Sequence, residues 1–123
     1  MNHLHHTIAA FNRRNFQDAV RHAAEGLAAA RGRDEAFWMG LLDACEGYEK
    51  LAAKDLNQAE PKLIASMHKL RNFGFRYQDF EVTVALAGIR LALEEIRRVR
   101  GETGRVFDVS LLPQLRLAEK ALV

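Results

Sequence analysis

Residues 37–51 read FWMGLLDACEGYEKL and hold the only tryptophan and the only cysteine of this 123-residue chain. Apolar residues recur here at steps of three and four, the spacing that places side chains on one face of a helix. Five residues make up that face: Phe37, Leu41, Ala44, Tyr48 and Ala52. Four more widen it beyond the usual apolar stripe of a surface helix: Trp38, Leu42, Cys45 and Leu51. We therefore expect a central helix that other helices cover from more than one side.

Glycine and acidic residues add two features to this central helix. Gly40 and Gly47 each cost a helix about 1 kcal/mol relative to alanine. They lie seven residues apart and so share a face, where we expect a second backbone to pass closely. An acidic row also follows the helix at three-residue spacing: Asp43, Glu46 and Glu49.

The composition favours one all-α domain over residues 1–123, because alanine and leucine are abundant and proline occurs only twice. The net charge of +2 is too small for the footprint of a whole nucleic-acid-binding domain. No apolar run reaches the roughly 18 residues of a membrane span, and the N-terminus lacks the apolar core of a signal peptide. A single cysteine, Cys45, excludes an internal disulfide. We therefore expect a soluble, reduced, cytoplasmic protein.

Helix signals predict a bundle of five to six helices built from antiparallel hairpins. We expect helices over about residues 3–12, 15–31, 34–52, 57–73 and 79–100. Four polar residues are the expected N-caps: Asn15, Asp34, Asn57 and Asp79. Residues 75–78, FRYQ, are expected to form a connector, in which the exposed aromatic residues and Arg76 are candidates for binding.

The longest expected helix, residues 80–99, has two apolar faces. One holds Val82, Leu86, Ile89, Leu93 and Ile96, and the other holds Phe80, Val84, Ala87 and Leu91. Covering both requires either a central position in the bundle or a symmetric pairing with a second copy. The final expected helix starts at Ser110, with Pro113 in its first turn, and offers only four apolar residues: Leu111, Leu115, Ala118 and Leu122. This limited cover favours a homodimer.

An internal echo supports the hairpin arrangement. Residues 16–31 and 56–71 align at an offset of 40, which matches Ala19 with Ala59. Such an echo suggests two stacked helical hairpins, similar to tetratricopeptide-type units. Two units are too few for a solenoid, so we expect a closed bundle.

Three stretches, FNRRNFQDA, FWMGLLDACEGYEKL and DLNQAEPKLIASMHKL, resemble the bacterial and archaeal helical family called domain of unknown function 309. The resemblance covers roughly residues 8–72, and the matching positions are Phe11, Asn12, Phe16, Ala19, Gly40, Leu41, Leu42, Ala44 and Ala59. It implies an all-helical fold. It also implies a metal-dependent hydrolase activity, inferred in that family from an Ala-His-Glu motif followed by a second glutamate. Val20, Arg21 and Ala24 stand at those positions here, so the resemblance implies a degenerate site.

The residues alone offer a second route to a metal site. His22 and Glu25 lie three apart on one helix, the acidic row lies on another, and His68 is a further candidate ligand. Helical bundles build carboxylate–histidine sites from facing helices. These residues are, however, better spaced as an outer polar face, and we expect His3, His5 and His6 on an exposed terminus. We therefore predict no catalytic residue, no bound metal and no other cofactor.

The remaining interpretation is a non-enzymatic module that acts through its own copy or another protein. Nucleic-acid binding would use basic residues that are scattered along the chain, and the acidic row would repel phosphate. The enzyme and nucleic-acid interpretations remain as alternatives. Our candidate residues for a pocket or binding surface are His22, Trp38, Asp43, Glu46, Tyr48 and Arg76.

Overall fold

The computed structural model describes residues 2–102 and 105–118. Its five α-helices are α1 (His3–Asn12), α2 (Phe16–Ala29), α3 (Arg33–Ala52), α4 (Leu56–Leu70) and α5 (Val82–Gly101). Between α4 and α5 lie a 3₁₀ turn, η1 (Arg71–Phe73), and a small antiparallel hairpin of β1 (Arg76–Tyr77) and β2 (Phe80–Glu81). A second 3₁₀ turn is η2 (Val109–Leu111). The expected all-α helical bundle is confirmed.

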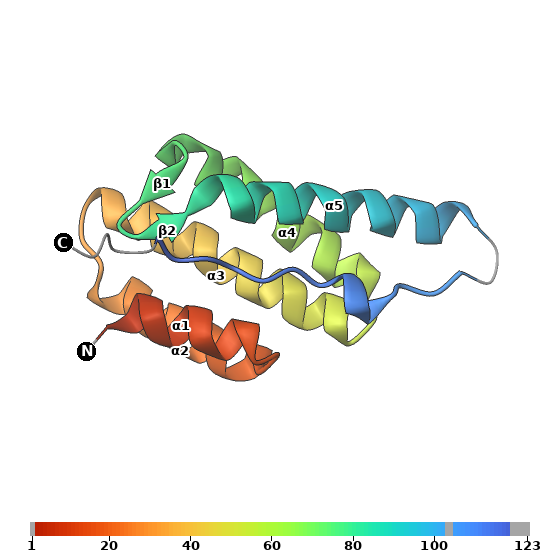
Figure 1. Ribbon diagram of the computed structural model, residues 1–123, viewed down its shortest axis with the longest axis horizontal. Helices are drawn as coiled ribbons and strands as arrows, with labels where there is room; N and C mark the ends of the chain where they lie inside the picture. Colours follow the sequence, from red (N-terminus) through yellow and green to blue (C-terminus); the bar gives the residue numbers. More distant parts are fainter. Residues whose placement is uncertain (1, 103–104, 119–123) are drawn as a thin grey trace.

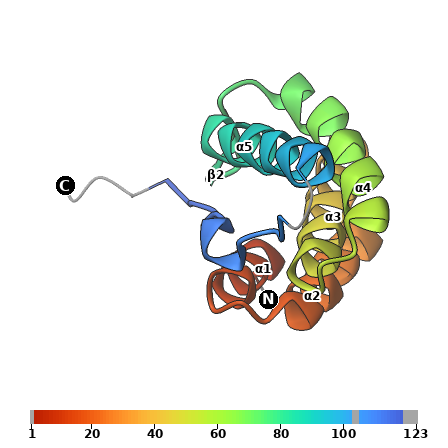
Figure 2. The ribbon, with the colours of Figure 1, turned by 90° about the vertical axis from the view of Figure 1, so that its right-hand side faces the viewer.

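The helices form an arc in which each packs mainly against its neighbours in the chain. Figure 2 shows this arc end-on, with α1 and α5 at its two ends. Residues 105–118, which we call the C-terminal segment, lie on the inner side of the arc. Figure 1 shows them running lengthwise between α1 and α5. None of the helices in the described part of the chain is both long and apolar enough to cross a membrane.

The α1–α2 and α3–α4 hairpins repeat the same turn at an offset of 40 residues. Arg14 and Lys54 occupy the same place in the two turns and have left-handed φ angles of 65° and 62°. Asn15 and Asp55 then cap the following helices, and each side chain accepts a hydrogen bond from the N–H three residues on. The sequence echo therefore corresponds to a repeated helical hairpin.

The interior of α3 is as closely packed as its glycines predict. Leu41 and Tyr48 are fully buried. A methyl group placed on Gly47 would lie 2.8 Å from Leu63 Cδ2, so α4 packs closely enough that any side chain there would displace Leu63. The Ser66 hydroxyl of α4 donates a 2.7 Å hydrogen bond to the Gly40 carbonyl. The predicted close approach at the glycine face is thus the α3–α4 contact.

Three predicted N-caps are wrong. Helix α3 already begins at Arg33, ahead of Asp34, and follows Gly32. Helix α4 is capped by Asp55, because Asn57 lies inside its first turn. Asp79 does not cap α5, since Phe80 and Glu81 pair with the FRYQ stretch as a β-hairpin before the helix starts.

The prediction of a final helix starting at Ser110 is also wrong for the described residues. Only η2 is helical there, and the chain from residue 112 to residue 118 is extended. Proline favours an extended backbone at the residue before it, and Leu112, which precedes Pro113, has φ −61° and ψ 131°. A short isolated helix is marginal, and partners outside the segment satisfy its backbone instead. Leu122 lies outside the described residues.

The two apolar faces predicted for residues 80–99 differ in how far they are buried. The first is buried throughout: Val82, Leu86, Ile89, Leu93 and Ile96. On the second face, Phe80 is buried in the β-hairpin and Val84 is half-buried, whereas Ala87 and Leu91 are exposed. The arc and the C-terminal segment therefore cover one face completely and the other only in part.

Candidate binding groove

The C-terminal segment occupies a groove between α1 and α5 and buries three apolar side chains there. Phe107, Leu112 and Leu115 are buried. Gln114 and Arg116 between and beyond them are exposed. The segment therefore has one side against the helices and the other towards solvent.

Asn12, the last residue of α1, binds the backbone of Leu115 through two hydrogen bonds. Its Nδ2 donates to the Leu115 carbonyl at 3.0 Å. The Leu115 N–H donates to Asn12 Oδ1 at 2.9 Å. A side-chain amide carries one acceptor and two donors, so Asn12 pairs with Leu115 as a neighbouring strand would.

Arg14, in the turn after α1, binds two carbonyls earlier in the segment. Its Nη1 donates to the Pro113 carbonyl at 2.6 Å and its Nη2 to the Leu112 carbonyl at 2.7 Å. Hydrogen bonds with an ionised donor are roughly twice as strong as neutral ones. Asn12 and Arg14 together thus bind three carbonyls of the segment, those of Leu112, Pro113 and Leu115.

The β-hairpin binds the end of the segment as a third strand. Phe80 and Leu117 form an antiparallel bridge. The Glu81 N–H donates to the Arg116 carbonyl at 3.0 Å, and the Ala118 N–H donates to the Asp79 carbonyl at 2.6 Å. Like the bonds from α1, these bonds involve only the backbone of the segment. These bonds therefore fix the backbone of the segment and do not depend on the identity of its side chains.

Helix α5 contacts the segment at two places, at Gly88 and at Glu95. Pro113 packs on Gly88, where a methyl group would lie only 3.1 Å from Pro113 Cβ. At the other end of the groove, the nearly buried carboxylate of Glu95 accepts hydrogen bonds from Arg105 at 2.5 and 3.1 Å. The segment is thus fixed at both ends and at Pro113.

Two features of the groove are left unused by the segment. The Tyr48 hydroxyl is buried and has no hydrogen-bond partner among the described residues. Burial raises the pKa of Tyr48 well above its ordinary value, so this group remains a neutral donor. Beside the segment lies a hollow of about 750 Å³, lined by Ile8, Asn12, Glu81, Val84, Leu115, Arg116 and Leu117.

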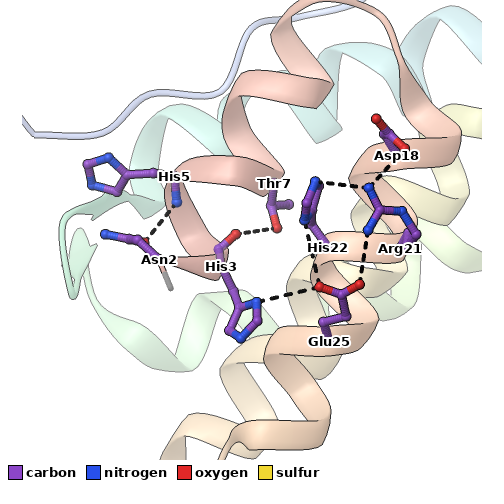
Figure 3. A network of polar contacts seen from close by, with 8 residues as sticks. All are labelled: Asn2, His3, His5, Thr7, Asp18, Arg21, His22 and Glu25. Atoms are coloured by element: carbon purple, nitrogen blue, oxygen red, sulfur yellow. Dashed lines mark hydrogen bonds and ion pairs between the residues drawn. The ribbon is translucent and has the colours of Figure 1, made fainter.

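A polar cluster joins α1 and α2, as Figure 3 shows. The Nδ1 atoms of His3 and His22 lie 3.8 and 3.9 Å from the same oxygen, Oε2 of Glu25. The other oxygen of Glu25 accepts a 3.0 Å hydrogen bond from Arg21. His3 is half-buried, not on a fully exposed terminus as predicted. Among the described residues, no group of three or more His, Cys, Asp or Glu side chains is arranged to hold a metal ion.

Three of the other candidate residues pair with charged side chains elsewhere in the fold. Asp43 and Glu46 pair with Lys69 and Lys62 of α4, on the outer side of the α3–α4 hairpin. Arg76 pairs with Glu81 in the β-hairpin.

Trp38 lines a separate hollow of about 500 Å³ that also includes His3, Gly26 and Asp34. A concave site beside Trp38 therefore exists. Tyr48 lies near the groove, since its hydroxyl and Pro113 both lie against Gly88. Arg76 lies at the groove's edge, because its partner Glu81 lines the hollow beside the segment.

Sequence reasoning missed Asn12, Arg14 and Gly88 as groove residues. The sequence suggested Asn12 only as a match to a family, and it did not single out Arg14 from the other basic residues. The repeat carried a usable signal, because Ala52 and Lys54 occupy the equivalent positions in the second hairpin. Asn12 stands where the second hairpin has Ala52, and a polar residue in place of an apolar one indicates a position at which the two hairpins make different contacts.

No protein-family model, curated protein or solved structure matches this chain. The resemblance to domain of unknown function 309 therefore stays a prediction.

Proposed function

We propose that this chain is a non-enzymatic binding module whose groove between α1 and α5 receives an extended segment of another protein. The observation that carries the proposal is the set of backbone-directed hydrogen bonds from Asn12 and Arg14. Such bonds accept any extended chain that fits the groove, as strand addition does in other peptide-binding proteins. The chain's own C-terminal segment is then a built-in competitor.

A second copy of the chain is a less favourable source of the segment. A second copy would supply the same bonds that the chain already makes with its own segment. The chain's own segment is tethered and acts at an effective concentration of roughly millimolar, so a second copy competes poorly with it. A foreign segment can gain what the chain's own segment leaves unmade. It can bond the Tyr48 hydroxyl and fill the neighbouring hollow of about 750 Å³.

The test releases the segment and offers the groove a free peptide. The released variant, Leu112→Glu/Leu115→Glu, places two carboxylates where the wild type buries leucines that are 7% and 3% exposed. The probe is a fluorescein-labelled peptide of residues 107–118, FDVSLLPQLRLA. We expect the released variant to bind it at least about tenfold more tightly than the wild type, because competition lowers the apparent affinity of an occupied site.

Matched controls separate groove binding from adhesion to an apolar surface. Asn12→Ala in the released variant removes both bonds to Leu115 and is expected to weaken the peptide about fivefold or more. Lys54→Ala, in the equivalent turn of the other hairpin, is expected to change nothing. A released variant that keeps its helical circular dichroism and binds no peptide contradicts the proposal. So does one that loses its helical signal, since the segment would then belong to the core.

Self-association is a second candidate, and the exposed part of α5 favours it. Leu91 and Leu111 are 65% and 58% exposed, and both border a hollow of about 220 Å³ that Phe107 also lines. Exposed apolar patches of this kind are typical of interaction sites. Sedimentation at tens of micromolar tests this candidate. A dimer that Leu91→Glu converts to a folded monomer supports it, and a monomeric wild type excludes it.

A further inference from the structure

We infer that the groove selects segments with the sequence Leu-Pro-x-Leu and that Gly88 is the residue that recognises the proline. The inference rests on the proposed function, because it names the class of segment that the groove accepts. The segment belongs to another protein, because a foreign segment can bond the Tyr48 hydroxyl and fill the hollow that the chain's own segment leaves open.

The chain's own occupant shows which positions of such a segment the groove reads. Leu112 and Leu115 are buried, and Gln114 between them is exposed. A buried position demands an apolar side chain, whereas an exposed position accepts many. The two leucines are therefore fixed requirements, and the third position of the sequence is free.

Gly88 makes room for the proline ring. A methyl group built on Gly88 would lie 3.1 Å from Pro113 Cβ and 3.2 Å from Pro113 Cγ. Those distances are tighter than ordinary van der Waals contact, so any side chain at residue 88 would push the ring outward. Gly88 lies inside α5, where glycine is a poor helix former. Its fit to the ring gives this residue a reason to be glycine.

Proline suits the remaining contacts of the site as well. Its nitrogen carries no hydrogen, so the backbone at this position leaves no donor unpaired. Its ring keeps the preceding Leu112 extended, and this places the Leu112 and Pro113 carbonyls before the two nitrogens of Arg14. Stiffness of the peptide and contact with Gly88 thus both favour proline, and an experiment must separate them.

The experiment pairs two peptides with two grooves. The peptides are FDVSLLPQLRLA and the same sequence with alanine in place of Pro113. The grooves are the released variant with Gly88 and the released variant with Gly88→Ala. Steric fit of a small apolar group typically discriminates at least about tenfold. We expect the proline peptide to bind the Gly88 groove about tenfold more tightly than the alanine peptide. We expect that ratio to fall below about threefold with Gly88→Ala, because the alanine removes the fit to the proline ring. The preference that remains comes from the stiffness of the peptide, which the substitution does not change.

Each outcome has a distinct meaning. Equal binding of the two peptides to the Gly88 groove overturns the inference and leaves the proposed function intact. A tenfold ratio that persists with Gly88→Ala assigns the preference to stiffness and overturns the role of Gly88. Binding of neither peptide means that the proposed function fails. A peptide with alanine in place of Gln114 is the control and should bind like the parent.

The intact chain gives a second readout that does not depend on added peptide. The Leu115 N–H is bonded to Asn12 and reports on whether the segment is seated. We expect Gly88→Ala to speed exchange of this amide with solvent severalfold, and Gly88→Ala/Pro113→Ala to restore it towards that of Pro113→Ala alone. The same acceleration in the presence and absence of Pro113 would contradict a direct contact.

Discussion

The α1–α2 and α3–α4 hairpins have turns of the same conformation but make different contacts with the rest of the molecule. At the turn of the second hairpin, Lys54 is exposed, and the two helices are joined by close packing such as that of Gly47 on Leu63. At the turn of the first hairpin, Asn12 and Arg14 point their polar groups at the C-terminal segment. The same backbone geometry therefore serves packing in one repeat and binding in the other.

This difference teaches that the two parts of the molecule should respond differently to mutation. Contacts between buried apolar groups cannot be exchanged for water without a large loss of free energy. Hydrogen bonds from a side chain to a backbone are worth only about 1 kcal/mol net, because water replaces them. We expect the packing of the α3–α4 hairpin to determine global stability and the hydrogen bonds of Asn12 and Arg14 to determine only the position of the segment.

The largest effect is expected at the centre of α3. Leu41 is fully buried, and Leu41→Ala should lower the free energy of unfolding by about 2–5 kcal/mol through lost burial and a new cavity. Urea unfolding followed by circular dichroism measures this loss. Met39→Ala, at an exposed position two residues away, is the control. A loss below about 1 kcal/mol for Leu41→Ala would place the core elsewhere.

A pH-dependent effect is expected at the same helix. Burial raises the pKa of Cys45 from its ordinary value of 9.0 to about 12. Above pH 9 the unfolded chain loses a proton that the folded chain keeps, so stability falls as pH rises from about 9 to 12. The slope is at most about 1.4 kcal/mol per pH unit.

Unfolding midpoints of the wild type and Cys45→Ala between pH 8 and pH 10 test this effect. The comparison uses the change of each protein with pH, which removes the pH-independent cost of the substitution. Between pH 9 and pH 10 the wild type should lose more stability than the variant. Parallel curves would show that the thiol is not buried as described.

A smaller and local effect is expected at the groove. Asn12→Ala removes both hydrogen bonds to Leu115, and about 1 kcal/mol of local stability should go with them. Amide exchange should show the Leu115 N–H exchanging about fivefold faster, while amides in the centre of α3 stay unchanged. Gln114→Ala, an exposed neighbour in the same segment, should leave both rates as they are. Acceleration throughout α3 would mean that the segment and the helices unfold together.

The smallest effect is expected at the outer ion pairs of the α3–α4 hairpin. Lys62 Nζ lies 3.4 Å from Glu46 Oε1, and both side chains are substantially exposed. Exposed pairs contribute about 0–1 kcal/mol, so Lys62→Ala should move the urea midpoint no more than Lys54→Ala does. A clearly larger shift would show that charge pairing, and not packing alone, holds this hairpin together.

Much of the helical framework was predictable from local patterns. The apolar face of residues 80–99 is buried as the periodicity indicated, and Asn15 caps α2 as its residue type favours. The N-cap predicted at Asp79 failed, because β-pairing of the preceding residues competed with helix formation. Local propensity is a weak prior that such tertiary contacts override.

The candidate site was much less predictable. Of the residues proposed for a binding surface, Asp43 and Glu46 are paired with lysines on the outer side. Asn12 and Gly88, in contrast, reach the groove from helices that are far apart in the sequence. Their partners lie at residues 115 and 113. No periodicity within one helix reports on a contact of that separation.

The sequence by itself determined the helices, their hairpin pairing and the close packing at Gly40 and Gly47, because each depends on residues within about one repeat of one another. Only the tertiary structure decided the course of the C-terminal segment. Its leucines suit an amphipathic helix as well as an extended chain, and local preferences leave the choice open. Bonds from Asn12, Arg14 and the β-hairpin satisfy the backbone of the extended form. Those partners come together only when the arc of helices has formed.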